Sequence, residues 1–82
     1  MTKKSKEQII SDVFDELRRA EEKHPGWPEN IFEQLAIVGE EFGEVQQAAL
    51  QAKWEQGKPE RIYEEAVQMA AMSLRFLLEG RD

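Results

Sequence analysis

Two clusters of proline and glycine, at residues 24–28 (HPGWP) and 57–59 (GKP), divide the chain into three segments. Proline lacks a backbone N–H and glycine is conformationally free, so both interrupt regular structure. Within each segment the apolar residues recur every three or four positions and do not alternate, which indicates helices. The sequence therefore predicts an all-α domain with helices at about 4–23, 29–55 and 59–79, the last one stopped by Gly80.

The apolar faces of these helices predict how they pack. The first helix carries a single apolar stripe. The third is apolar over more than half its circumference, so we expect both other helices, or another subunit, to cover it. The second has a four-three spacing that predicts a seam against a near-antiparallel helix; its members are Ile31, Leu35, Val38, Phe42, Val45, Ala49 and Ala52.

The length of the chain, 82 residues, allows a single domain spanning residues 1–82, with residues 1–5 expected to form a flexible tail. A domain this small buries a modest share of its surface. We therefore expect three helices per chain in a helical bundle completed by oligomerisation, as a homodimer or homotetramer.

The charge and composition exclude several classes of function. The chain has 11 Lys and Arg against 17 Asp and Glu, a net charge of −6, which disfavours nucleic acids and anionic membranes as partners. It has no cysteine, which excludes disulfides, thiolate zinc sites and cysteine nucleophiles. Apolar runs stay well short of the roughly 20 residues that span a bilayer, and the start of the chain lacks a signal-peptide pattern, so we expect a cytoplasmic protein.

Five residues on the second and third helices do not fit a solvated charged face. Glu40, Glu41 and Glu44 fall within about 100° of arc at the edge of the apolar face. On the third helix Glu65 falls on the apolar arc, with Gln68 as its i+3 neighbour, whereas the adjacent glutamate points to solvent. Glycines at positions 39 and 43 interrupt the second helix, and small residues there often mark close approach of a backbone or ligand.

A divalent cation would explain this clustering of carboxylates. Buried charges must be paired or must bind a metal. Basic residues do not obviously supply the pairing, because Arg61 and Arg75 lie near Gln68 and the second helix has no basic residue before Lys53. Oxygen ligands of this kind select Mg²⁺, Mn²⁺ or Ca²⁺. The alternative interpretation is a set of half-exposed glutamates that hydrate one end of a bundle.

Residues 40–44 (EEFGE) and 65–68 (EAVQ) resemble the EExxE…ExxD signature of the MazG-like, all-α nucleoside triphosphate pyrophosphohydrolases. The resemblance covers about residues 24–78. It implies Mg²⁺-dependent hydrolysis of a (deoxy)nucleoside triphosphate to the monophosphate and pyrophosphate, as nucleotide-pool housecleaning, with Mn²⁺ as a possible replacement. The metal ligands that it implies are Glu40, Glu41, Glu44 and Glu65, and either Glu41 or Glu44 would accept the proton of the attacking water.

The chain departs from this signature at the last ligand, where Gln68 replaces the family's Asp. Because glutamine is neutral, the site would carry one negative charge fewer and could hold one metal where the family holds two. The alternative function is a non-catalytic helical interaction module that keeps the fold with a degraded metal site. A DNA-binding or antitoxin-like protein is a third interpretation, which the acidic charge disfavours.

Four further residues are candidates for binding the substrate. Trp27, between two prolines, is either a cap on the bundle end or a stacking surface for a base. Gln34 lies on a similar side to the glutamates and could read a base edge. Lys53 could meet a phosphate or be solvated, and Arg75 could pair with a carboxylate or phosphate.

Overall fold

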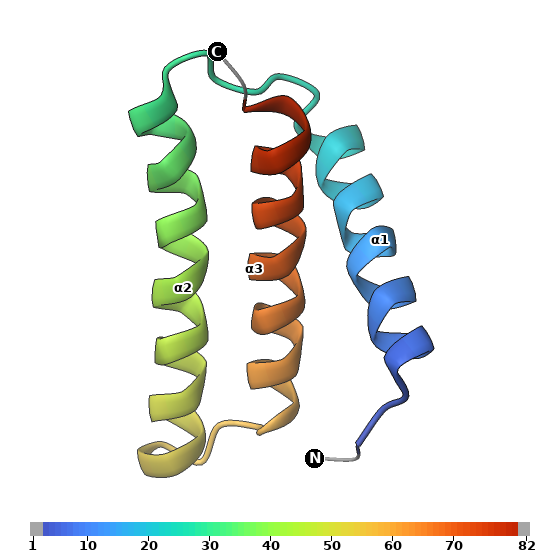
Figure 1. Cartoon of the computed structure of the whole chain (residues 1–82). Helices are drawn as coiled ribbons and strands as arrows, with labels where there is room; N and C mark the ends of the chain where they lie inside the picture. The colour runs from blue at the N-terminus through green and yellow to red at the C-terminus, as the bar shows by residue number, and fades with distance from the viewer. Residues whose placement is uncertain (1–2, 81–82) are drawn as a thin grey trace.

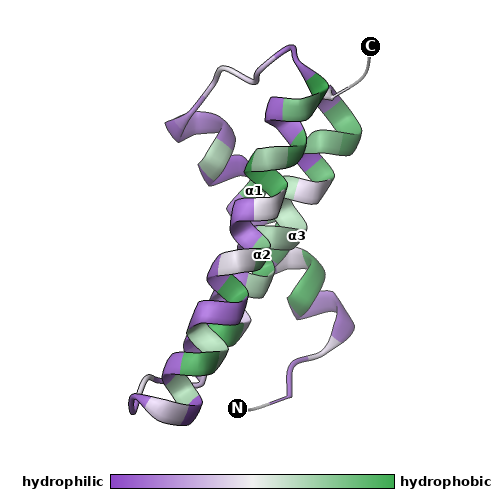
Figure 2. Ribbon diagram, turned by 90° about the vertical axis from the view of Figure 1, so that its left-hand side faces the viewer, coloured by the Kyte–Doolittle hydropathy of each residue, from purple (hydrophilic) through white to green (hydrophobic). Residues whose placement is uncertain are grey.

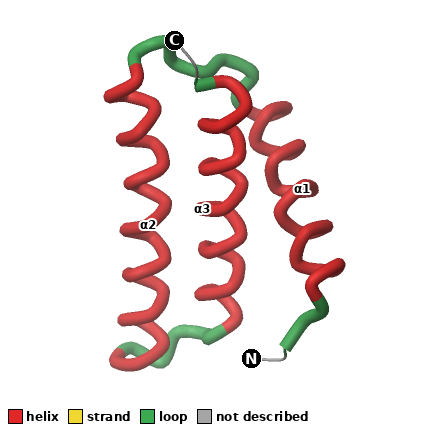
Figure 3. Tube along the Cα trace, viewed as in Figure 1, coloured by secondary structure: helices red, strands yellow, loops and turns green. Residues whose placement is uncertain are grey.

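The computed structural model describes residues 3–80 and consists of three helices joined by two short loops (Figures 1 and 3). The helices are α1 (Lys6–Lys23), α2 (Ile31–Trp54) and α3 (Glu60–Glu79). No strand occurs between residues 3 and 80. The predicted all-α class is confirmed, and each helix boundary lies within two residues of its predicted position.

Side-chain caps determine where the first two helices begin. The Ser5 hydroxyl accepts a hydrogen bond from the backbone N–H of Gln8 at 3.1 Å. The Asn30 side chain accepts from the N–H groups of Phe32 and Glu33, at 2.8 and 3.3 Å. These bonds satisfy N–H groups that have no partner within the helix. Asn30 therefore explains why α2 begins after residue 30.

Helix α3 lies between the other two helices, as Figure 1 shows. Helix α2 runs antiparallel to α3, whereas α1 runs in the same direction as α3. In the described part of the chain, α1 and α2 each pack against α3 and do not pack against one another. The expectation that both other helices cover α3 is confirmed.

The buried core of the chain is small and partly polar. Its buried apolar cluster consists of Leu17, Ala71 and Met72. Three polar side chains are buried as well, with exposed fractions of 2% for Gln34, 7% for Glu65 and 3% for Arg75. Many large apolar side chains are exposed instead: Ile9, Ile10, Phe14, Ile31, Phe32, Leu35, Phe42, Leu50, Trp54, Leu77 and Leu78. The chain therefore leaves much apolar surface uncovered.

The apolar seam predicted on α2 is largely outside the packed interface, which corrects the sequence interpretation. Ile31, Leu35 and Phe42 keep 38%, 48% and 53% of their surface exposed. The face of α2 that packs on α3 is instead the one that carries Gln34 and Ala48, both buried. Figure 2 turns α2 toward the viewer and shows apolar residues recurring along it. Part of the apolar seam is therefore turned away from the chain's own core, although Val38 packs against the core cluster.

Part of the expected N-terminal tail is engaged with α1 and α3. The Lys4 ammonium lies 3.0 Å from a carboxylate oxygen of Asp12 and 4.3 Å from the centre of the Tyr63 ring. The Tyr63 hydroxyl donates to the same carboxylate at 2.6 Å. Residues 1–2 of that expected tail lie outside the described residues. Within residues 3–80, no helix combines the length and the apolar character needed to cross a membrane.

Candidate metal centre

Three glutamate carboxyl groups from two helices meet where α2 packs on α3. Glu41 and Glu44 come from the middle of α2, and Glu65 comes from the second turn of α3. One carboxylate oxygen of each residue lies within 4.8 Å of the other two. Glu65 is buried and Glu64 is exposed, which confirms the helical-face prediction for this adjacent pair. The antiparallel packing of α2 on α3 therefore joins the two halves of the sequence pattern.

The proximity of these groups makes their simultaneous ionisation unfavourable. Partial burial, followed by the charges of Glu44 and Glu65, raises the pKa of Glu41 to about 7. Burial, followed by the neighbouring Glu65 carboxyl, raises the pKa of Glu44 as well. Like charges held close together disfavour the charged form of each group. The cluster therefore requires either protons or a cation to neutralise it.

Two buried carboxylate oxygens of the cluster residues lack a hydrogen-bond partner within the described part of the chain. Oε2 of Glu41 and Oε2 of Glu65 have no hydrogen-bond donor among residues 3–80. The other oxygen of Glu65, Oε1, accepts from Nη2 of Arg61 at 2.8 Å. Arg61 therefore supplies for Glu65 a pairing that was not obvious from the sequence. A signal for this pair was present in the sequence, because residues four apart share a helix face.

The donor set fits a hard divalent cation. Carboxylate oxygens are the ligands that Mg²⁺, Mn²⁺ and Ca²⁺ prefer, and this cluster contains no sulfur or imidazole ligand. A buried carboxylate oxygen without a donor loses its hydration and receives nothing in return. A cation bound among Glu41, Glu44 and Glu65 would satisfy both orphaned oxygens and remove the repulsion between the charges.

The other two predicted ligands occupy the edge of the cluster. Glu40 is exposed on α2 and is not among the three residues whose oxygens converge. Gln68 is half-buried, one turn after Glu65. It lines a cavity of about 330 Å³ together with Glu41 and a second cavity of about 500 Å³ together with Glu65. Gln68 therefore lies beside the cluster, whereas Glu40 lies on its solvent side.

A residue of α1 that the sequence interpretation missed also borders this region. Glu16 lines both cavities that Gln68 lines, and its charge contributes to the raised pKa of Glu41. Its carboxylate pairs with Arg19, one turn further along α1. Ala20, which lies four positions from Glu16 on the same face of α1 and packs against the core cluster, could have indicated that Glu16 borders the interior.

The glycines of α2 face open space within the chain. A side-chain carbon added at Gly39 or Gly43 would meet nothing within 4 Å. The close approach expected from these glycines is therefore absent from the described residues.

The candidate substrate-binding residues are divided between the two ends of the bundle. Trp27 packs against the core cluster in the loop before α2, as its cap interpretation predicts. Gln34, in the first turn of α2, is buried and donates to the backbone carbonyl of Pro28 at 2.8 Å. Lys53 is exposed at the far end of α2 with its ammonium over the Trp54 ring. With a rise of about 1.5 Å per residue, Gln34 and Lys53 are separated by roughly 28 Å along the helix.

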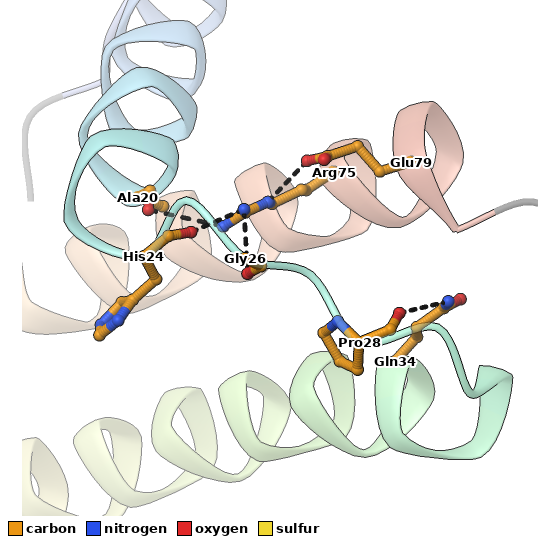
Figure 4. A network of polar contacts seen from close by, with 7 residues as sticks. All are labelled: Ala20, His24, Gly26, Pro28, Gln34, Arg75 and Glu79. Atoms are coloured by element: carbon orange, nitrogen blue, oxygen red, sulfur yellow. Dashed lines mark hydrogen bonds and ion pairs between the residues drawn. The ribbon is translucent and has the colours of Figure 1, made fainter.

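Arg75 fastens the loop between α1 and α2 to α3 (Figure 4). Its guanidinium donates to the carbonyl oxygens of His24 at 2.7 Å and Gly26 at 3.3 Å, and to the Glu79 carboxylate at 2.7 Å. It also lies 5.0 Å from the centre of the Trp27 ring. The pairing of Arg75 with a carboxylate is confirmed, but the partner is Glu79 and not a residue of the glutamate cluster. Its remaining donors are directed at backbone carbonyls.

Comparison of the chain with models of protein families, with curated proteins and with solved structures gives no match.

Proposed function

We propose that the chain is a Mg²⁺-dependent nucleoside triphosphate pyrophosphohydrolase whose metal is held by Glu41, Glu44 and Glu65. The observation that carries this proposal is the convergence of three carboxylates within 4.8 Å, with two buried oxygens that lack a donor among residues 3–80. The resemblance of residues 40–44 and 65–68 to the MazG-like signature supplies the reaction class.

The proposed reaction is attack of water on the α-phosphorus of the substrate. The water oxygen forms a bond to phosphorus, the bond from phosphorus to the bridging oxygen breaks, and pyrophosphate leaves. Mg²⁺ held by Glu41, Glu44 and Glu65 would neutralise charge on the phosphate oxygens and would lower the pKa of a water. A glutamate that does not give both oxygens to the metal can accept the water's proton, and Glu41 is our candidate for this base. Glu44 is the alternative base.

The amide at Gln68 leaves the site one negative charge short of the family pattern. Three carboxylates neutralise one divalent cation with one charge to spare, whereas a second cation would leave the site with a net positive charge. We therefore propose a single tightly held metal, with Gln68 at its edge orienting a water through the amide oxygen or a phosphate through the amide NH₂ group.

The proposed enzyme is a homo-oligomer in which α2 contacts a second copy. The exposed seam of Ile31, Leu35 and Phe42 supports this assembly, because contiguous apolar surface of this kind marks an interaction site in a soluble protein. The small buried core of one chain supports it as well. The glycines of α2 leave open space on the helix, where the backbone of a second copy could approach closely.

The test is pyrophosphate release from a panel of canonical and modified (deoxy)nucleoside triphosphates. The assay is run with Mg²⁺, with Mn²⁺ and with a chelator. We expect metal-dependent release from a subset of the panel, which would also identify the preferred base and sugar. Release from none of these substrates by the folded protein would overturn the proposal and favour the non-catalytic interaction module.

A further inference from the structure

The only cation that contacts the buried carboxyl of Glu65 among residues 3–80 is the guanidinium of Arg61. The distance between Nη2 of Arg61 and Oε1 of Glu65 is 2.8 Å. The second oxygen of the same carboxyl, Oε2, is buried without a donor in that part of the chain and belongs to a residue of the glutamate cluster. One oxygen of the Glu65 carboxyl is therefore held by an arginine, and the other is left without a partner among the described residues.

The two partners of this ion pair differ in their surroundings. The side chain of Glu65 is 10% exposed, whereas that of Arg61 is 56% exposed. A buried carboxylate needs a compensating cation, because it has lost its hydration. A half-exposed guanidinium is hydrated on leaving the pair, and pairs with an exposed partner contribute little to stability. Glu65 therefore depends on a cation, but Arg61 does not depend on Glu65.

The cavities around Arg61 give its side chain another place to lie. Arg61 lines the cavity of about 500 Å³ between α1 and α3. It also lines a cavity of about 320 Å³ between α2 and α3, together with Glu44, Glu65 and two glutamines of α2. A guanidinium that moves away from Glu65 thus remains at the rim of the carboxylate cluster. Arginine binds phosphate oxygens through two parallel hydrogen bonds, which suits this position.

We propose that Arg61 is the internal counter-ion of Glu65, that a divalent cation displaces it from Glu65, and that the displaced guanidinium then binds the phosphate chain of the substrate. This inference rests on the proposed function, because it requires the glutamate cluster to bind a metal. It adds a residue outside both halves of the sequence pattern, with two successive anionic partners. In the metal-free protein the partner is a carboxylate, and in the metal-bound protein it is a phosphate.

The proposal predicts two effects of opposite sign when Arg61 is replaced by a neutral residue. Affinity for the metal alone increases, because the metal no longer competes with a guanidinium for Glu65 and meets one positive charge fewer. Affinity for the phosphate chain decreases, because a bidentate partner is lost. A purely structural ion pair predicts something different, since its loss would leave Glu65 less ordered and would weaken metal binding.

The experiment is calorimetric titration of Mn²⁺ alone into the wild type, Arg61→Gln and Arg18→Gln, followed by titration of inorganic tripolyphosphate at saturating Mn²⁺. Arg18 is the matched control, because it is an exposed arginine paired with Asp15 on α1 and loses the same charge. Relative to Arg18→Gln, we expect Arg61→Gln to bind Mn²⁺ roughly twofold to fivefold more tightly and tripolyphosphate roughly tenfold more weakly. Arg61→Lys, which keeps the charge, should restore most of the wild-type Mn²⁺ affinity.

Unchanged or weaker Mn²⁺ binding by Arg61→Gln, in a comparison where the wild type binds Mn²⁺, would overturn this inference and leave the proposed function standing. If Arg61→Gln bound tripolyphosphate as tightly as Arg18→Gln does, the proposed contact between Arg61 and the phosphate chain would be overturned. A wild type that binds no Mn²⁺ would overturn the proposed metal site and this inference together.

Discussion

Arg75 on α3 donates a hydrogen bond of 2.7 Å to the backbone carbonyl of His24, at the C-terminal end of α1. The arginine is 3% exposed, so its guanidinium is largely removed from water. The bond joins two segments that are 51 positions apart in the sequence. It ties the loop that precedes α2 to the helix that carries Glu65, and so fixes how α2 enters the bundle.

Replacement of Arg75 by methionine should therefore destabilise the protein. Methionine keeps much of the side-chain volume but leaves the carbonyls of His24 and Gly26 without their donors. We expect the free energy of unfolding to fall by about 3 kcal/mol, as measured by denaturant unfolding monitored by circular dichroism. Arg18→Met on the exposed face of α1 is the control and should stay within about 0.5 kcal/mol of the wild type. Equal effects of both changes would show that the Arg75 contacts contribute no stability.

The raised pKa of Glu41 predicts a pH dependence of metal stabilisation. The folded protein binds this proton more tightly than the unfolded chain, whose carboxyl has the ordinary pKa of 4.5. The stability of the metal-free protein should therefore decrease as pH rises from about 4.5 to about 7 and level off above that. A metal ion must displace the proton below the folded pKa, so its stabilising effect should be smaller there.

The measurement is the shift in melting temperature caused by millimolar Mg²⁺ at about pH 5.5 and at about pH 8. We expect the larger shift at the higher pH. Asp12, whose pKa is lowered to about 2 mainly by its hydrogen bond from Tyr63, does not titrate in this range and should not mask the effect. An equal shift at both pH values would contradict the assignment of Glu41 as a metal ligand.

Replacement of Gln68 by a carboxylate should increase the affinity for the metal, whereas loss of a glutamate from the cluster should decrease it. Gln68→Asp adds a carboxylate beside the cluster, and the affinity of an oxygen-ligand site rises with the charge of its ligands. We expect Mn²⁺ binding to become tighter by on the order of tenfold. Gln68→Asn is the matched control, because it has the same length as aspartate and no charge, and it should not tighten binding. Tightening by asparagine would assign the effect to size and not to charge.

The exposed seam of α2 predicts a self-association that one substitution weakens. Leu35 is 48% exposed within one chain and lies on α2 with Ile31 and Phe42. Leu35→Gln should weaken self-association by on the order of tenfold or more, because a symmetric interface loses the apolar side chain twice. Sedimentation velocity at several protein concentrations measures this directly. Ile9→Gln on α1 makes the same kind of change away from the seam, and a larger effect of that control would place the interface on α1.

The sequence predicted where the helices begin and end better than it predicted which face of each helix is buried. Proline, glycine and capping residues act locally, which is why the boundaries of the helices could be predicted to within two residues. The separation of buried Glu65 from exposed Glu64 also follows from helical geometry alone. The seam of α2 is covered by the chain itself only in part, because periodicity reveals an apolar stripe but not how much of it the same chain covers.

The residues of the candidate site could be predicted only where the spacing of charged residues along one helix placed them on a partly apolar face. The pairing of α2 with α3 brings Glu41 and Glu44 to Glu65, as the two half-patterns together suggested. The contribution of Glu16 depends on the packing of α1, about which the spacing of its charges gives no information. Arg75 is engaged by backbone carbonyls of a loop, and no side-chain pattern in a sequence indicates such partners.

The most direct test of the central claim is calorimetric titration of Mg²⁺ and Mn²⁺ into the wild type, Glu65→Gln and Glu64→Gln. The two variants remove one carboxylate from adjacent positions of α3, one buried in the cluster and one exposed. We predict that the wild type and Glu64→Gln bind the metal with similar affinity and that Glu65→Gln binds it at least on the order of tenfold more weakly. Equal binding by both variants, or none by the wild type, would contradict a metal centre at Glu41, Glu44 and Glu65.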